Sequence, residues 1–302
     1  MRNSSVVYLG ANIYYWGIAE QRRLLLEGVR PWAMKARQEG WASRFWYCRY
    51  DARGPHVFVL FTTTNECKGV LRGFLEARIS EFLREIPSRE QLSLEQLEKH
   101  HRECRGRELS IADGMEGLAD NNTYLMFDHE SGAYPLNFSA AMPGAAEFWE
   151  RMEKLCFWTI DQLEQDPTKA AIRWLAAVDR CLPGSGLVPE QYWRLHASTL
   201  IRPLRARLET NEAEVLSTLP AIVSESNRRV FSCVWDELNN GSAFEFDLAG
   251  LVKLIAEDNR GAVERRLRLL REINHLVMGQ LGQWVKFEIP IVFYAWQRNL
   301  SV

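Results

Sequence analysis

A predicted turn near residues 51–55 brings together four side chains that can carry charge or move protons: Arg49, Asp51, Arg53 and His56. A histidine can accept or donate a proton near neutral pH, and a guanidinium or carboxylate can hold a polar substrate beside it. The same cluster would also suit an ordinary charged turn, in which His56 is structural and Arg49 pairs with Asp51. Both the acid–base and the structural interpretation follow from these residue types.

Two apolar segments must position this cluster. Residues 44–50 are almost all aromatic or apolar, and residues 56–63 are nearly continuously apolar. The residues between them favour a turn, so we predict two antiparallel strands. Because side chains alternate along a strand, Arg49 should point to the face opposite Trp46, Cys48 and Tyr50.

The first half of the chain predicts further strands and helices around this hairpin. A strand is expected over residues 5–16, and a helix over 18–38 that Pro31 bends or divides. The helix expected over 65–84 has Asn65 as its N-cap, and its buried stripe is Val70, Leu71, Phe74, Ile79, Phe82 and Leu83. Residues 121–127 predict another short extended segment.

The second half is mostly helical in its pattern. The helices expected there cover residues 145–164, 168–181, 190–209, 211–238, 247–258 and 260–279, and a terminal strand is expected at 285–296. Together these elements predict an α+β fold: a mixed or antiparallel sheet with an early aromatic hairpin, helices packed on it and a helix-rich C-terminal half.

Composition limits the classes of function. The 302 residues, 47% of them hydrophobic, suggest a single domain over residues 1–302, with a possible subdivision near 140–145. A net charge of -2 gives no general attraction to nucleic acid or to an anionic membrane, and no apolar run reaches the ~18 residues of a membrane span. The six cysteines are widely spread, which is typical of reduced cytoplasmic thiols, and no metal-ligand cluster is evident.

The order of segments and three short motifs resemble a known family. The hairpin residues 49–60 are similar to a family pattern R-Y-x-D-P-x-x-H-L-R-L-R, residues 124–136 to Y-x-x-E-x-x-R-Y-G-G, and residues 275–282 to H-M-x-x-N-R-x-G. This chain therefore resembles the C-terminal domain of lantibiotic dehydratases, which also occurs as a stand-alone protein in thiopeptide biosynthesis.

The resemblance implies one of two activities. One eliminates glutamate from glutamylated serine or threonine, and the other joins two dehydroalanines in a formal [4+2] cycloaddition that forms a pyridine ring and expels the leader peptide. Elimination requires cations that hold the glutamyl carboxylates, but the family's arginines fall here on Phe58, Leu60 and Ala133. The apolar replacements favour the pyridine synthase.

The expected partner is a dehydrated, azole-containing precursor peptide, leader plus core, together with other enzymes of the same cluster. The resemblance implies a cytoplasmic enzyme that needs no cofactor. Two alternatives stay open: a glutamate-elimination lyase of a split dehydratase, and a non-catalytic partner that binds the leader peptide.

The resemblance and the residue types together nominate the site. The expected catalytic residues are His56, His275, Tyr134 and Glu130. The expected substrate-binding residues are Arg49, Asp51, Trp46, Phe58, Tyr14, Arg265 and Arg268. Each has a structural alternative: His275 and Tyr14 as core residues, Glu130 and Tyr134 as a solvated loop, and the arginines of the late helix as a solvated face.

Overall fold

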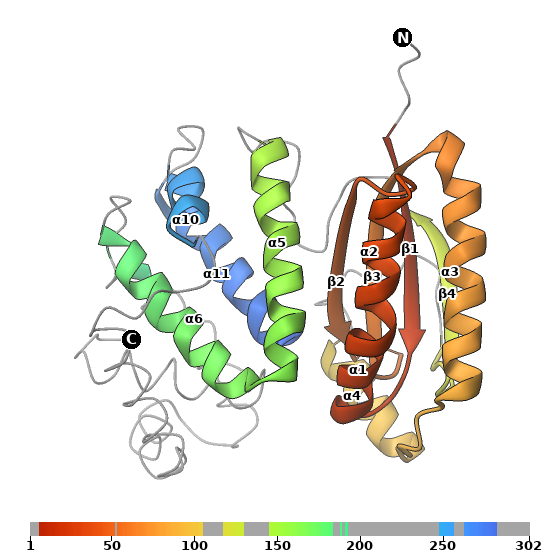
Figure 1. Ribbon diagram of the computed structural model, residues 1–302. Coiled ribbons are helices and arrows are strands. Elements are labelled where there is room, and N and C mark those ends of the chain that lie inside the picture. The colour runs from red at the N-terminus through yellow and green to blue at the C-terminus, as the bar shows by residue number, and fades with distance from the viewer. Residues whose placement is uncertain are drawn as a thin grey trace. The chain divides into compact units, whose positions relative to one another are not determined.

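The computed structural model describes residues 6–51, 53–104, 117–129, 145–183, 188, 191–192, 248–256 and 263–282. The chain forms two compact units, residues 1–165 and 166–302. The first unit contains an antiparallel sheet and its helices, and the second is helical in the ranges described (Figure 1). The predicted α+β class is confirmed.

Four strands form the sheet in the order β2-β3-β1-β4. They are β1 (Val6–Tyr14), β2 (Arg44–Tyr50), β3 (His56–Thr64) and β4 (Thr123–His129). The predicted hairpin is confirmed, with Tyr50 opposite His56 and the turn closed by the Gly54 N–H, which donates to the Asp51 carbonyl at 3.0 Å. Strand β1 lies between β3 and β4, so it is central although it is the first strand of the chain.

The register gives the sheet two faces, because residues directly opposite each other in an antiparallel pair point the same way. One face, here called the His56 face, carries Trp46, Cys48, Tyr50, His56, Phe58, Leu60, Gly10, Asn12, Tyr14 and Phe127. The other, here called the helix face, carries Phe45, Tyr47, Arg49, Val57, Val59, Phe61, Leu9, Ala11, Ile13 and Met126.

A continuous helical segment links β1 to β2. It consists of α1 (Ile18–Arg23), a π-helical stretch η1 (Leu24–Val29) and α2 (Arg30–Gln38), so the helix is not broken at Pro31, which lies in the first turn of α2. Its buried residues are Gln21, Leu24, Leu25, Gly28, Val29, Trp32, Ala33 and Ala36. They recur every four residues, whereas an α-helix has 3.6 residues per turn, and the wider π turn keeps them aligned.

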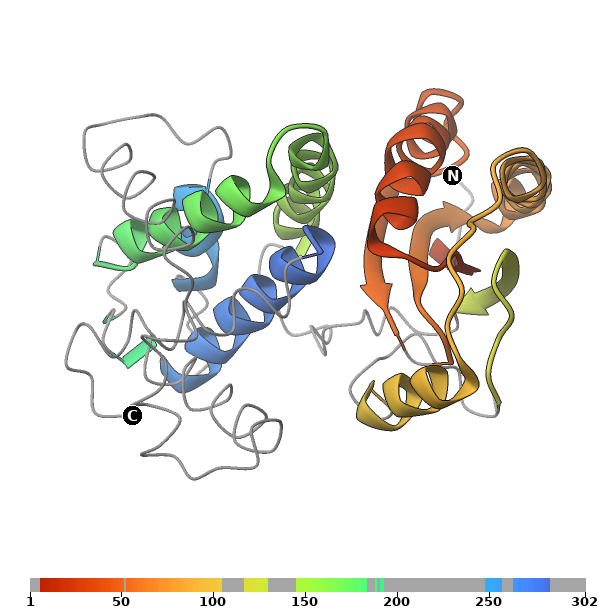
Figure 2. The ribbon, with the colours of Figure 1, turned by 90° about the horizontal axis from the view of Figure 1, so that it is seen from below.

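Helix α3 (Asn65–Glu85) and the first helical segment both pack on the helix face of the sheet, as Figure 2 shows. Its N-cap is Thr64 rather than the predicted Asn65, because Thr64 is still extended and its hydroxyl accepts from the Cys67 N–H. Val70 is 53% exposed, contrary to the prediction. The buried stripe contains Leu75 instead, which lies one turn from both Leu71 and Ile79, and the predicted Phe74 is only half-buried.

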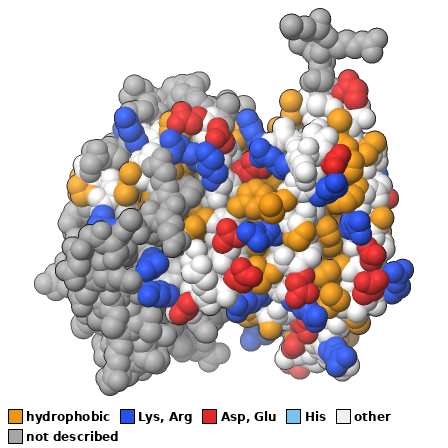
Figure 3. Space-filling view, viewed as in Figure 1, with side chains coloured by type: hydrophobic (Ala, Val, Ile, Leu, Met, Phe, Trp, Pro, Cys, Tyr) orange, Lys and Arg blue, Asp and Glu red, His pale blue; other side chains and the backbone are white. Residues whose placement is uncertain are grey.

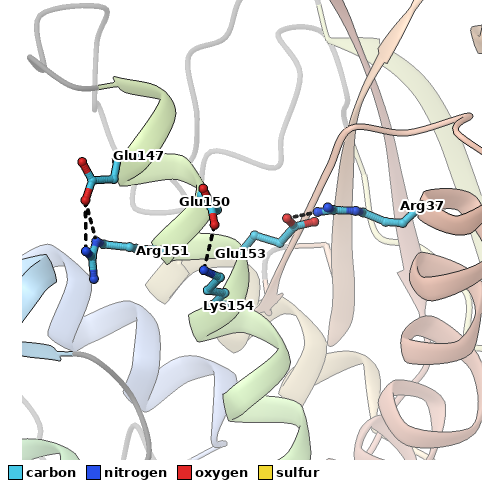
Figure 4. Close-up of polar contacts among 6 residues, drawn as sticks. All are labelled: Arg37, Glu147, Glu150, Arg151, Glu153 and Lys154. Carbon is cyan, nitrogen blue, oxygen red and sulfur yellow. Dashed lines mark hydrogen bonds and ion pairs between the residues drawn. The ribbon is translucent and has the colours of Figure 1, made fainter.

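Helix α5 (Ala145–Glu164) packs against β2, the edge strand of the sheet. Its Glu153 is buried, accepts the Phe45 backbone N–H at 3.0 Å and pairs with Arg37 of α2 (Figure 4). The Tyr47 and Thr159 hydroxyls, 2.9 Å apart, form a second link. An edge strand leaves backbone donors unpaired, and Glu153 satisfies one of them.

Replacing Glu153 by leucine should lower the free energy of unfolding by about 2 kcal/mol, because the Phe45 N–H loses its acceptor inside the protein. Glutamine keeps one oxygen for that N–H, so Glu153→Gln should cost less than half as much. The Arg37 side chain is 43% exposed, so the ion pair itself adds little. Urea denaturation of the three proteins measures the differences, and equal losses in both variants would refute the role of the Phe45 bond.

Gly10 in β1 is required by a neighbouring ring. A Cβ at this position would lie 2.6 Å from the Phe127 ring. Gly10→Ala should therefore cost about 1–2 kcal/mol through overpacking, and Phe127→Leu should relieve most of it in the double variant. Gly69→Ala in α3 is the matched control: nothing lies within 4 Å of its Cβ, and the change should stabilise by about 0.5–1 kcal/mol. Thermal unfolding measured by calorimetry checks both.

The first unit also includes α4 (Leu94–Cys104), which lies at the end of the sheet where the β2–β3 hairpin turns (Figure 1). The exposed surface of its helices carries both signs of charge among apolar side chains (Figure 3). Examples on the first helical segment are the pairs Arg23–Glu27 and Lys35–Glu39. None of the helices in the described ranges combines the length and the apolar character needed to cross a membrane.

The second unit contains α6 (Pro167–Cys181), α10 (Leu248–Ala256) and α11 (Val263–Gln280). A buried polar bridge joins α6 to α11: the Trp174 indole N–H donates to the Asn274 Oδ1, and Asn274 Nδ2 donates to the Tyr192 hydroxyl at 2.6 Å. The helices predicted at 190–209 and 211–238 lie almost wholly outside the described residues, and the strand at 285–296 lies entirely outside them.

Candidate functional site

The His56 face is the candidate site in the first unit, because it places the predicted residues Tyr14, Trp46, His56 and Phe58 together. Tyr14, His56 and Tyr50 form one row across three strands, with ring centroids 4.9 Å apart for Tyr14–His56 and 5.9 Å for Tyr50–His56. All four predicted residues are at most 2% exposed. These four side chains are therefore packed inside the protein, on a face that is mostly apolar or aromatic.

Aromatic rings continue along this face beyond the His56 row. Phe58 lies 6.0 Å from Tyr50 and 5.9 Å from Phe127, both between ring centroids. Trp46 meets Trp149 of α5 edge-on at 6.4 Å. Leu60, the other position at which the family pattern has an arginine, is 1% exposed on the same face. The described part of this face thus has apolar side chains where the family pattern has guanidinium groups.

His56 is held as a neutral imidazole of defined tautomer. Its Nδ1 lies 2.9 Å from the Gly54 carbonyl, which can only accept, so Nδ1 carries the hydrogen and Nε2 carries the lone pair. Burial lowers the pKa of His56 to about 4, with the Arg53 charge acting in the same direction and the Gly54 bond against it. At neutral pH the ring is therefore uncharged, with its lone pair at Nε2.

Arg53, which the sequence placed only in the turn, is fixed beside Tyr14. Its Nη1 donates to the Tyr14 hydroxyl at 3.3 Å, and its guanidinium lies 5.7 Å from the centroid of the Tyr14 ring. Arg53 has a φ of 66°, and three further hydrogen bonds hold it in this conformation. Its backbone N–H donates to His101 Nδ1, and its Nε donates to the Gly117 carbonyl. Its own carbonyl accepts from the Ala119 N–H. A hydroxyl that accepts from a guanidinium becomes a better hydrogen-bond donor.

Arg49 does not join this site, and Asp51 lies in the hairpin turn that follows β2. Arg49 lies on the helix face, as the alternation predicted. The Arg49 guanidinium is not hydrogen-bonded to the Asp51 side chain, and the Asp51 carbonyl closes the hairpin turn. The substrate-binding role expected for both residues therefore stays a prediction.

The other predicted residues are placed only in part. Glu130 and Tyr134 lie outside the described residues. The backbones of Arg265, Arg268 and His275 lie in α11 of the second unit, and their side chains lie outside the described part of the structure. Asn274, next to His275, was not predicted as a functional position, although an asparagine in an apolar helical stretch is the kind of residue that makes a buried polar bridge.

Within the described ranges, no group of three or more histidine, cysteine, aspartate or glutamate side chains could hold a metal ion. The cysteines whose side chains are described, Cys48, Cys67, Cys156 and Cys181, are free thiols.

The fold of this chain is similar to folds of solved structures. It is similar to that of the pyridine synthase TbtD from thiomuracin biosynthesis, with a TM-score of 0.65 and 20% identity over 96% of each chain. It is also similar to part of the tRNA-dependent lantibiotic dehydratase MibB from Microbispora sp. 107891, with a TM-score of 0.51 and 13% identity over all of this chain and 29% of MibB. No curated protein matches the sequence. The model of the lantibiotic biosynthesis dehydratase C-terminal family matches residues 9–297, so the chain belongs to that family, as its motifs predicted.

Proposed function

We propose that this protein is a pyridine synthase, which joins two dehydroalanines of a dehydrated, azole-containing precursor peptide without a cofactor. One observation carries the proposal: Phe58 and Leu60 are buried on the same face as His56, at the positions where the family pattern has arginines. An apolar face suits a neutral, unsaturated peptide, whereas a glutamylated intermediate would bring carboxylates that such a face cannot pair.

The reaction begins with transfer of an amide proton from nitrogen to oxygen, which turns one dehydroalanine into a C=C–N=C(OH) diene. This diene adds to the alkene of the second dehydroalanine and forms two C–C bonds. Loss of water, and then of the leader peptide as its carboxamide, leaves the pyridine ring. Holding the two alkenes together contributes most, up to about 7–11 kcal/mol in favourable cases.

His56 and Tyr14 suit the proton transfers of this scheme. Neutral His56 would accept the amide proton at Nε2, and Tyr14, polarised by Arg53, would donate to the amide oxygen. The two rings are adjacent, so one amide group could contact both. His275, Glu130 and Tyr134 remain further candidates for the later proton transfers.

Mass spectrometry of the protein mixed with a dehydrated, azole-bearing precursor peptide tests the proposal. The expected products are a macrocycle and a leader peptide ending in a carboxamide. Tight binding without a change in mass would refute catalysis and favour a leader-binding partner.

A glutamylated precursor in a parallel reaction tests the lyase alternative. Formation of dehydroalanine there, with no macrocycle from the first peptide, would assign the protein to glutamate elimination instead.

A further inference from the structure

A buried arginine without a partner lies on the helix face, away from the site proposed above. Arg49 is only 8% exposed and stands in one row with Ile13 and Val57. All three of its guanidinium nitrogens are buried, and none has a hydrogen-bond partner among the described residues. Buried charged groups are normally paired, because an unpaired one loses its hydration without compensation.

The charges around Arg49 do not supply the missing partner. The pKa of Arg49 is lowered to about 10, mainly by burial. The charge of Arg22 in α1 acts in the same direction, and Tyr47 and Asp51 act in the opposite direction. Neither Arg49 nor Arg22 forms an ion pair with any described residue. The Asp51 charge thus acts on Arg49 without a hydrogen bond, and no described carboxylate is hydrogen-bonded to the Arg49 guanidinium.

A guanidinium presents its N–H groups as a planar fork, which matches the two oxygens of a carboxylate. We propose that Arg49 and Arg22 form a binding site for a small carboxylate anion on the helix face of the sheet. The carboxylate would accept from the Arg49 fork, and the positive charge of Arg22 would attract it further. This inference does not depend on the proposed reaction, which uses the opposite face.

Thermal unfolding of the intact protein in sodium acetate and in sodium chloride, at equal ionic strength and neutral pH, tests the site. The wild type should show a saturable increase in Tm that is specific to acetate. The increase should be about 2–4 °C when the acetate concentration is about ten times its Kd. Arg49→Met should abolish the increase and should raise the Tm in chloride, because it removes an unpaired buried charge. Arg22→Gln should weaken the effect, and the control Arg84→Met, at a 74% exposed side chain, should retain it.

A second measurement keeps the proposal open to refutation if the Arg49 variant does not fold. Acetate titrated into wild-type protein with 15N-labelled arginine should shift one buried Nε–H resonance, and chloride should not. An equal Tm increase in Arg49→Met and wild type, or no acetate-specific shift of a buried Nε–H resonance, would overturn the carboxylate site and leave Arg49 solvated by internal water.

Discussion

Replacing His56 by asparagine should leave the protein folded and lower the rate of pyridine formation about 10²–10⁴-fold, the usual contribution of a positioned acid or base. An asparagine side chain places its NH₂ near the position of the imidazole Nδ1, so the bond to the Gly54 carbonyl can persist. It has no atom at the position of Nε2, so the proton acceptor is lost. Single-turnover kinetics with the dehydrated precursor peptide measures the loss.

His56→Gln is the matched control for this prediction. Glutamine reaches the position of Nε2 but loses the bond to the Gly54 carbonyl, so it should lower stability more than asparagine does. If His56 is only a structural turn residue, asparagine will retain nearly full activity and the proposed proton acceptor will be wrong. Tyr14→Phe should slow the reaction as well, and with Arg53→Gln it should show non-additive losses, because Arg53 is expected to act through the Tyr14 hydroxyl.

Acidification should destabilise the protein through His56 by up to about 3 kcal/mol. The pKa of His56 is about 4 in the folded protein, lowered by burial, against 6.5 without the fold. Between these values the unfolded chain binds a proton that the folded chain does not, so the free energy of unfolding decreases as pH falls. The effect should be absent above pH 6.5 and complete below pH 4.

Urea denaturation of the wild type and of His56→Asn across this pH range isolates the contribution. Other groups, such as Asp128, whose pKa is lowered by the Lys68 hydrogen bond, titrate in both proteins and cancel in the difference. The wild type should lose stability relative to the variant as the pH falls. Parallel curves would mean that His56 is not buried as a neutral ring.

Local patterns predicted most elements of the fold because they depend on neighbouring residues. The hairpin, the opening strand and α5 follow from alternation, turn residues and helical spacing, and their bounds agree closely with prediction. The errors in α3 have the same local origin. Thr64 and Asn65 can both act as an N-cap, and Val70 lies beside the apolar stripe, so composition alone does not distinguish these positions.

The site was less predictable because it depends on the order of strands. Tyr14 meets His56 only because β1 inserts between β3 and β4, and no local pattern specifies that pairing. The positive φ of Arg53 and its bond to Tyr14 follow from the same arrangement. The role of Glu153 as the acceptor for a backbone N–H of β2 could not be predicted either, since its two partners lie more than a hundred residues away in the sequence.

The π-helical stretch η1 has a consequence for the permitted length of the first helix. The buried positions of this helix are separated by four, four and four residues, as in Gln21, Leu25, Val29 and Ala33. Deleting Glu27 would change this spacing to four, three and four, which matches the 3.6 residues per turn of a regular α-helix. A chain shortened by that one residue would retain its apolar stripe without any π turn. Single-residue indels among homologues should therefore concentrate within residues 24–29, where a change of length can be absorbed by a switch of helix type.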